Sequence, residues 1–318
     1  MIYNVLAEKI GGSKVMAIAA LLGFLLSWLL LKANFSFLPK DQGREFAVNG
    51  ALSKGKTRGV GLVMFFPLII SAVLFMNLTV ELIIYGFLLF LEMLSGYLDD
   101  GSKIPWSDYK KGLIDFIVAV GTSVTFVYFN STDILLFNNQ ISIHPVVYVI
   151  LASILVWLSI NATNCSDGVD GLCSSVSVVT LAGILLAYRS YLSSDDMIAD
   201  LILIGVLIGY LIFNSSPSSM LMGDAGSRLI GLFIAMMMMK SQHPFGYILV
   251  AIVLIVDGIA GLIKIFLKRF FKISVLKNTR TPIHDEMRKN RGWSDTQVVN
   301  RFTIVQIVAV AVLFIIES

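Results

Sequence analysis

The chain has 318 residues, of which 57% are hydrophobic and 14% charged, and its formal net charge is +3. Soluble domains are about 45–50% apolar and about 25% charged, so this composition excludes an ordinary soluble globule and a disordered chain. A disulfide-stabilised scaffold is also excluded, because only two cysteines are present. The apolar residues form long blocks and not the alternating pattern of barrel strands, which predicts membrane-spanning helices.

Ten apolar blocks have about the length needed to cross roughly 30 Å of hydrocarbon as helices. In chain order they are residues 15–33, 59–78, 80–98, 112–129, 144–160, 171–192, 198–213, 227–240, 245–267 and 301–316. The ninth block contains Asp257, Gly258 and Gly261, which predicts a break or bend. The expected fold is therefore all-α, a single polytopic membrane domain formed by residues 1–318.

The lysines and arginines are divided very unequally between the segments that join these blocks. Ten spans place both termini on one side and sort the segments into two alternating sets, one with 20 cations and the other with only four. The positive-inside rule assigns the cationic set to the cytoplasm, so both termini are expected on the extracytoplasmic side. Almost all polar clusters lie in the cytoplasmic set, which predicts an active site at the cytoplasmic face.

The first cytoplasmic segment ends with cations among glycines. Lys54, Lys56 and Arg58 lie close to Gly55, Gly59 and Gly61, directly before a predicted helix. Cations and backbone N–H groups at a helix start can hold a phosphate. The same residues also suit the positively charged flank of a spanning helix. The segment is therefore expected either to bind a phosphate or to be a helix flank that binds no ligand.

Aspartates in the second and fourth cytoplasmic segments suggest a metal site. Asp99 and Asp100 follow an apolar helix, whose carboxyl end disfavours negative charge. Mg²⁺ would offset that cost, since it binds a few carboxylates together with water and phosphate oxygens. Asp224, between two glycines before another apolar helix, is expected either to cap that helix or to complete a metal-binding set with Asp99 and Asp100.

The third cytoplasmic segment concentrates amides, acids and glycines. Asn164, Asp167 and Asp170 can hydrogen-bond the edge of a nucleobase or a sugar. Taken singly, Asp167-Gly168 is an ordinary turn signal, but the whole cluster favours a binding site. Asn214 adds a further amide at the end of the seventh predicted helix.

The fifth cytoplasmic segment is the most cationic, and it contains His284. In the predicted topology His144 and His243 lie on the opposite side, so His284 shares its face with the acids and is expected to be functional. Three acids inside predicted helices are candidates by default, but packing roles fit them equally well and no catalytic role is assigned to them: Glu92, Asp115 and Asp257.

Taken in order, these motifs resemble those of the polyprenyl-phosphate N-acetylhexosamine-1-phosphate transferases. The matching residues are Leu98-Asp99-Asp100, Asn161-x-x-Asn164-x-x-Asp167-Gly168-x-Asp170-Gly171-Leu172, Phe213-Asn214 and Met222-Gly223-Asp224-x-Gly226-Ser227. Within that superfamily the chain is most similar to the phospho-N-acetylmuramoyl-pentapeptide transferases. The residues that support this narrower resemblance are Ser53-Lys54, Thr57, Gly61, Pro282-Ile283-His284, Gly292-Trp293 and Arg301-Phe302.

The resemblance implies a multi-pass enzyme of the bacterial plasma membrane that acts in peptidoglycan biosynthesis. UDP-MurNAc-pentapeptide and undecaprenyl phosphate would give lipid I and UMP, with Mg²⁺ as cofactor. Membrane lipids would surround the protein, a homodimer is implied, and no nucleic acid is a partner. The implied catalytic residues are Asp99, Asp100, Asp224 and His284, and the implied Mg²⁺ ligands are Asp224, Asp99 and Asp100. The implied substrate-binding residues are Lys54, Lys56, Asn164, Asp167, Gly168, Asp170 and Asn214, with the two lysines on the diphosphate.

Departures from the family pattern keep a second transferase open. The family usually has three consecutive histidines where this chain has His284-Asp285-Glu286, and an aromatic residue where it has Leu221. A sister enzyme that transfers GlcNAc-1-phosphate from UDP-GlcNAc to undecaprenyl phosphate is therefore the alternative. A CDP-alcohol phosphotransferase is disfavoured because Asp167-Gly168 is not followed by Ala-Arg. A secondary transporter is disfavoured because the acids lie at one interface and no internal repeat is visible.

Overall fold

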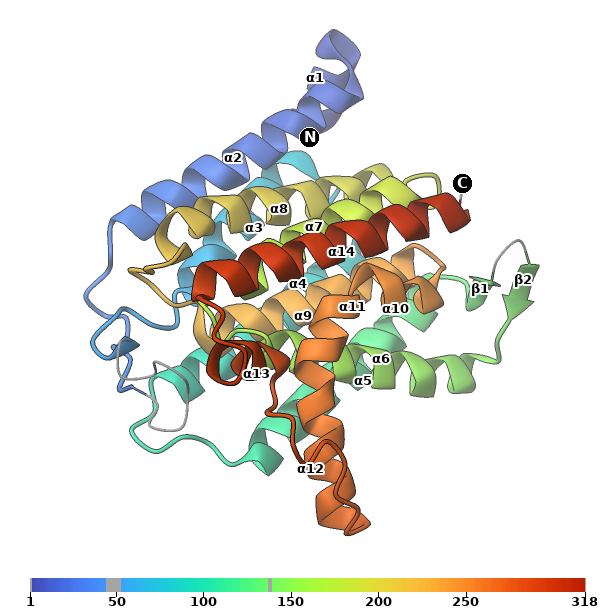
Figure 1. The fold of residues 1–318 in the computed structure, drawn as a ribbon. Helices are drawn as coiled ribbons and strands as arrows, with labels where there is room; N and C mark the ends of the chain where they lie inside the picture. Colours follow the sequence, from blue (N-terminus) through green and yellow to red (C-terminus); the bar gives the residue numbers. More distant parts are fainter. Residues whose placement is uncertain (1, 44–52, 137–138, 318) are drawn as a thin grey trace.

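The computed structural model describes residues 2–43, 53–136 and 139–317. Arg44, one of the cations of the first cytoplasmic segment, lies outside the described residues. Most of the described chain is helical, and the longer helices lie side by side in a bundle (Figure 1). This arrangement agrees with the helical membrane fold expected from the composition.

Helices of very different lengths follow one another along the described chain. In chain order they are α1 (Ile2–Ile10), α2 (Gly12–Lys32), α3 (Gly61–Phe75), α4 (Val80–Asp100), α5 (Asp108–Phe129), α6 (Pro145–Cys165), α7 (Leu172–Tyr188), α8 (Ser194–Asn214), α9 (Gly223–Lys240), α10 (Tyr247–Val250), α11 (Ile252–Leu254), α12 (Ala260–Phe270), α13 (Ile283–Lys289) and α14 (Asp295–Glu317). A short 3₁₀-helix, η2 (Pro244–Gly246), and a π-helix, η3 (Ile255–Ile259), flank α10 and α11, and the two strands are β1 (Asp133–Leu136) and β2 (Asn139–Ser142).

Six helices of the described chain are long and apolar enough to cross a membrane, namely α2, α4, α5, α6, α8 and α14. A seventh candidate is the broken helix that runs from Pro244 to Phe270. The apolar helices α3 and α7 are shorter, and α9 has 18 residues but carries Asp224, Arg228 and Lys240. Length and composition therefore support a polytopic helical membrane protein with six or seven candidate spans.

The ninth block is broken as predicted, but not at its glycines. Its two halves meet at an angle of 76° at Ala251, seven residues before Gly258, and the π-helix η3 lies within the second half. A side chain at Gly258 would overlap the backbone of Ala162 on α6, so a glycine allows the two helices to touch. Beyond the break, α12 projects away from the bundle (Figure 1).

A β-hairpin replaces the irregular segment expected between the fourth and fifth blocks. Strands β1 and β2 pair antiparallel, with Asp133 opposite Ser142. The Ser142 hydroxyl donates to the Asp133 carboxylate at 2.5 Å, and the Leu135 N–H donates to the Gln242 carbonyl at 2.8 Å. The hairpin follows α5, so it lies at the opposite end of the bundle from the predicted site residues that precede α5 (Figure 1).

Helix α9 lies at the centre of the bundle, since every residue from Gly223 to Met239 is buried. It packs closely against α3 and α4 through glycines. A Cβ at Gly61 would overlap the backbone of Gly226, and a Cβ at Gly96 would overlap that of Asp224. Small residues let helix backbones approach in membrane proteins, and here they bring the start of α9 against the end of α4.

A buried ion cluster lies inside the bundle, between α4, α5 and α9. Arg228 is 2% exposed, and its guanidinium lies 2.5 Å from Asp115 Oδ1 and 3.5 Å from Glu92 Oε1. It also donates to the Ser95 hydroxyl at 2.8 Å, while the Asn161 amide donates to Asp115 at 3.2 Å. We call Glu92, Asp115 and Arg228 the deep ion cluster. Arg228 is thus part of the core and not a flanking cation.

Candidate active site

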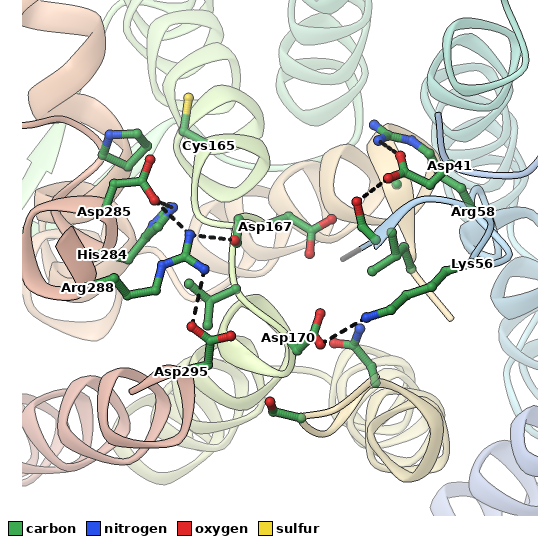
Figure 2. Close-up of a pocket in the computed structure, with 18 of the residues that line it drawn as sticks. Asp41, Lys56, Arg58, Cys165, Asp167, Asp170, His284, Asp285, Arg288 and Asp295 are labelled. Atoms are coloured by element: carbon green, nitrogen blue, oxygen red, sulfur yellow. Dashed lines mark hydrogen bonds and ion pairs between the residues drawn. The ribbon is translucent and has the colours of Figure 1, made fainter. Parts of the chain in front are cut away.

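A polar cavity of about 630 Å³ opens at the end of the bundle where α4, α6 and α8 finish and α9 begins (Figure 2). Seven of the predicted site residues line it: Lys56, Asn164, Asp167, Gly168, Asp170, Asn214 and His284. Asp99, Asp100 and Asp224 lie beside it, next to the lining residue Gly223. Lys54 is exposed and does not line the cavity.

The three predicted acidic residues meet around two shared cations. Arg58 Nε lies 2.7 Å from Asp100 Oδ1, and its Nη2 lies 3.4 Å from Asp224 Oδ1. The Lys111 ammonium contacts Asp99 and lies 3.2 Å from Asp224 Oδ2. We call these five residues the acid–cation cluster. The sequence motifs therefore identified acids that do converge. Arg58 was expected only as one of three cations that hold phosphate or flank a helix, and Lys111 was not singled out.

Asp100 also fixes the start of α9. Its two oxygens accept hydrogen bonds from the N–H groups of Asp224 (3.1 Å) and Ala225 (3.2 Å), the free donors of a helix N-terminus. Gly223 has φ +69°, and a Cβ there would overlap the Asp100 carboxylate. The residue that caps α9 is therefore Asp100, from α4, and the alternative expectation that Asp224 is the cap is wrong.

Arg58 is the most highly connected cation of the site. Burial lowers the pKa of its guanidinium, but attraction by Asp100 and Asp224 outweighs this effect and raises the pKa above its usual range. Its Nη1 also lies 3.0 Å from Asp41 Oδ1. Arg58 is therefore permanently charged, and it links the segment before α3 to α4 and α9.

The donor chemistry of the acid–cation cluster fits Mg²⁺, because carboxylate oxygens from separate elements point to a common region. The observed arrangement places the Lys111 ammonium between Asp99 and Asp224, where a metal ion shared by those two acids would lie. Accordingly, no group of three or more His, Cys, Asp or Glu side chains among the described residues is spaced to hold a metal ion. These acids can serve a divalent cation only if Lys111 moves aside.

His284 is buried and held by an acid from the broken helix. Its Nδ1 lies 2.8 Å from Asp257 Oδ2, and its backbone N–H donates to Asp257 Oδ1 at 2.8 Å. A Cβ at Gly168 would overlap His284 Nε2, so the glycine allows the third segment to pack on the ring. Donation from Nδ1 to Asp257 leaves Nε2 on the side of Gly168. Asp257 is a site residue to which the sequence assigned no role.

Lys56 and Asp170 connect two loops across the cavity (Figure 2). Lys56 Nζ lies 3.3 Å from Asp170 Oδ2 and 2.9 Å from the Ser218 hydroxyl. The other partner of that Asp170 oxygen is the Ser218 N–H, at 2.9 Å. On the α6 side, Asn164 donates to the Ser227 hydroxyl of α9 at 3.0 Å. The loop that follows α8 is thus tied to both the first and the third segments.

Asn214 is buried, and both of its polar atoms bind backbone. Its Oδ1 accepts from the Gly171 N–H at 2.9 Å, and its Nδ2 donates to the Met220 carbonyl at 2.9 Å. Gly171 has φ +84°, a conformation that favours glycine. The geometry gives Asn214 a scaffolding function, and its contact with uridine stays a prediction.

Arg288 closes the α13 side of the cavity (Figure 2). It donates to the Gly168 carbonyl at 3.2 Å and to Asp285 at 2.7 Å, and it lies 3.2 Å from Asp295. Sequence reasoning did not single out Arg288, Asp285 or Asp295 as site residues. The helical spacing of Asp285 and Arg288 on α13 was the available signal, since residues three apart face each other on a helix.

Comparisons with known proteins agree with these motifs. Residues 82–242 match the family model described as glycosyl transferase family 4. The phospho-N-acetylmuramoyl-pentapeptide-transferase of Treponema pallidum (strain Nichols) is 34% identical over 314 residues, which cover 92% of this chain and 86% of the relative. The enzymes of the same name from Latilactobacillus sakei and from the Wolbachia of Brugia malayi are 29% and 27% identical, covering 92% and 93% of this chain and 96% of each relative. The chain therefore belongs to glycosyl transferase family 4 and, within it, to the phospho-N-acetylmuramoyl-pentapeptide transferases.

Proposed function

We propose that this protein transfers phospho-MurNAc-pentapeptide from UDP-MurNAc-pentapeptide to undecaprenyl phosphate, giving lipid I and UMP in peptidoglycan biosynthesis. The observation that carries the proposal is the acid–cation cluster at the edge of a polar cavity. Phosphoryl transfer depends mainly on positioning and on neutralising charge on phosphate oxygens. Membership of the family supplies the identity of the substrates.

The cavity suits the nucleotide part of the donor. Asn164, Asp167 and Asp170 line it and supply the amide and carboxylate groups that recognise a base or a ribose. Lys56 and Arg58 also line it, and their cations would pair with the diphosphate oxygens. Asp99 would position the lipid phosphate or accept its proton, and His284 would contact the diphosphate.

We propose Mg²⁺ as the cofactor, with Asp224 as its principal ligand and Asp99 and Asp100 completing the acidic set. Mg²⁺ bound there would neutralise the diphosphate oxygens and make UMP a better leaving group. The protein's own part is to hold these carboxylates on the firmly packed ends of α4 and α9. Lys111 contacts both Asp99 and Asp224. Its ammonium would neutralise these two acids between turnovers, when Mg²⁺ is not bound.

The proposed setting is the bacterial plasma membrane, with ten spans, both termini outside and the cavity at the cytoplasmic face. The excess of cations in the segments around the cavity supports this orientation. A soluble nucleotide would then enter from the cytoplasm, while the lipid tail stays in hydrocarbon beside the broken helix. We propose a homodimer as the assembly, on the basis of the family resemblance alone.

The decisive test is release of UMP from purified protein supplied with undecaprenyl phosphate and either UDP-MurNAc-pentapeptide or UDP-GlcNAc. We expect UMP only with the peptide-bearing donor, inhibition by EDTA, and recovery when Mg²⁺ is added. Turnover of UDP-GlcNAc alone would identify the sister transferase. Transport of a solute across proteoliposomes without UMP release would instead identify a transporter, and turnover by metal-depleted protein in EDTA would contradict the Mg²⁺ assignment.

A further inference from the structure

A second cavity, of about 500 Å³, adjoins the polar cavity on the far side of α13. Lys264 of α12, Lys277 and Arg280 line it, together with Asp285 and Asn290. Asp285 lines both cavities, so they are neighbours. We call this second space the cationic cavity, because three of its lining side chains are basic.

The basic groups of the cationic cavity are largely unneutralised. Lys264 Nζ donates to the Thr279 carbonyl at 2.8 Å, an uncharged partner. Within the described ranges, the side chains of Lys277 and Arg280 form no ion pair. Asp285 is already engaged by Arg288 at 2.7 Å. The cavity therefore presents positive charge to whatever enters it.

The loop that carries these cations is held in place by its own backbone contacts. Glu286 accepts hydrogen bonds from the Arg280 N–H at 2.8 Å and from Asn290 Nδ2 at 2.6 Å. The bond from the Arg280 N–H is the main reason that the pKa of Glu286 is lowered. The main chain of Arg280 is anchored in this way, and Glu286 also attracts its guanidinium electrostatically, although the two side chains are too far apart to form an ion pair.

The two cavities differ in the balance of their charges. The polar cavity is lined by five aspartates, Asp41, Asp167, Asp170, Asp285 and Asp295. Its cations are already paired: Lys56 with Asp170, Arg58 with Asp41, Asp100 and Asp224, and Arg288 with Asp285 and Asp295. A free carboxylate therefore meets more negative charge in the first cavity than in the second, whereas the donor diphosphate would be neutralised in the first cavity by the proposed Mg²⁺.

We propose that the cationic cavity binds the carboxylates of the peptide carried by the donor substrate, and so selects a peptide-bearing donor over a plain UDP sugar. This inference rests on the proposed function. Lysine offers a point charge and arginine a bidentate fork, and both suit a carboxylate. Five extended residues span at most about 18 Å, and the two cavities share Asp285 in their linings.

The test compares two donors that differ only in charge: UDP-MurNAc-pentapeptide with free carboxylates, and the same molecule with its peptide carboxylates amidated. UMP release is measured in vesicles of zwitterionic phosphatidylcholine, for the wild type and for the double variant Lys277→Gln/Arg280→Gln. Loss of one charge-assisted hydrogen bond lowers affinity by about tenfold or more. We expect KM for the free-acid donor to rise by at least about that factor, with kcat unchanged and KM for the amidated donor unaltered.

Matched controls separate this effect from a general loss of basic charge. Lys268 and Lys272 are exposed and do not line the cationic cavity, so Lys268→Gln/Lys272→Gln should leave both donors unaffected. Arg280→Lys keeps the charge and should retain most of the preference for the free acid. Equal changes for both donors, or no change for either, would overturn the inference.

Three further outcomes identify the source of any failure. If the variants matter only in vesicles that contain anionic lipid, the cavity binds a lipid headgroup and the peptide assignment is wrong. If the wild type turns over both MurNAc donors with equal KM, the inference fails while the proposed function stands. If the wild type uses UDP-GlcNAc and neither MurNAc donor, both are overturned.

Discussion

Helices α4, α5 and α9 carry two charged clusters, and the clusters differ in what surrounds them. The acid–cation cluster lies where these helices meet the polar cavity. Its cations are partly exposed, Lys111 at 26% and Arg58 at 14%, while its acids are at most 9% exposed. The deep ion cluster lies one to two turns further along the same helices, and its side chains are at most 2% exposed. Similar residues are therefore placed at a surface that substrates reach and in a core that they do not.

This difference in burial changes what each cluster can do. Ions at the cavity can exchange one partner for another, because water and substrate phosphates are available. Ions in the core have no replacement partner, so a missing charge leaves an uncompensated one in a medium that solvates it poorly. The first cluster should consequently control activity and the second should control folding.

The largest expected effect is on activity, from neutralising an acid at the cavity. Asp99→Asn, Asp100→Asn and Asp224→Asn should each lower kcat by about 10³-fold or more, in line with the loss of a preorganised electrostatic contact. The measurement is UMP release, with insertion checked by the yield of monodisperse protein. Full activity in Asp224→Asn would remove it from the proposed metal site.

The matching change in the core should unfold the protein instead. Arg228→Met leaves Glu92 and Asp115 without their cation and should lower the free energy of unfolding by about 3–5 kcal/mol. The triple variant Glu92→Gln/Asp115→Asn/Arg228→Met removes all three charges and should recover most of that stability. Thermal unfolding in detergent measures both, and a triple variant no more stable than Arg228→Met would show that burial of charge is not the cause.

Asp257 and His284 form a buried pair, yet His284 lines the polar cavity. Substitutions in this pair therefore test whether buried ions next to the cavity control activity or folding. Asp257→Asn should lower kcat by about 10–100-fold, because the imidazole loses the carboxylate that orients it, with little change in KM. Asp257→Glu should restore part of the activity. In a His284→Ala background Asp257→Asn should have no further effect on kcat, and an additive loss would rule out a role through His284.

The smallest expected effects are at the edge of the polar cavity, and they compare two lysines. Lys56 lines the cavity and pairs with Asp170, so Lys56→Ala should raise KM for the UDP donor by about tenfold. Lys54 is exposed outside the lining, and Lys54→Ala should change KM by less than about twofold. A larger effect for Lys54 than for Lys56 would mean that the first segment rearranges when the donor binds.

The sequence predicted the acidic half of the site because its acids interrupt an otherwise apolar chain. A carboxylate at the carboxyl end of a membrane helix is costly and therefore conspicuous, as for Asp99 and Asp100, whereas Asp224 stood out between two glycines before an apolar helix. Arg58 was noted only as one of three cations of the first segment, and Lys111 was not singled out, since basic residues are ordinary at the cytoplasmic flanks of spanning helices. Pairing across loops far apart in the chain is set by the tertiary fold and leaves no local pattern.

Other features of the structure could not be predicted from the hydrophobic periodicity of the sequence, because they depend on how the helices and loops pack together. A bend in the ninth block was predicted from Gly258 and Gly261, but the 76° change of direction lies at Ala251. That Asp257 meets His284 depends on the tertiary packing of the second half and could not be read from the sequence. The hairpin of β1 and β2 was missed, since its short strands lie in a segment without a clear alternating pattern. Asn214 was correctly placed near the cavity, yet its bonds to backbone could not be read from its position alone.

The burial of α9 along almost its whole length has a consequence for how turnover is organised. A helix enclosed on every side cannot tilt or slide without disturbing all of its neighbours at once. Asp224, in the first turn of α9, is therefore held in a fixed position. In the proposed reaction the water-soluble donor and the lipid phosphate would both have to move to Asp224, so the motions of turnover would be those of the substrates and of the surrounding loops.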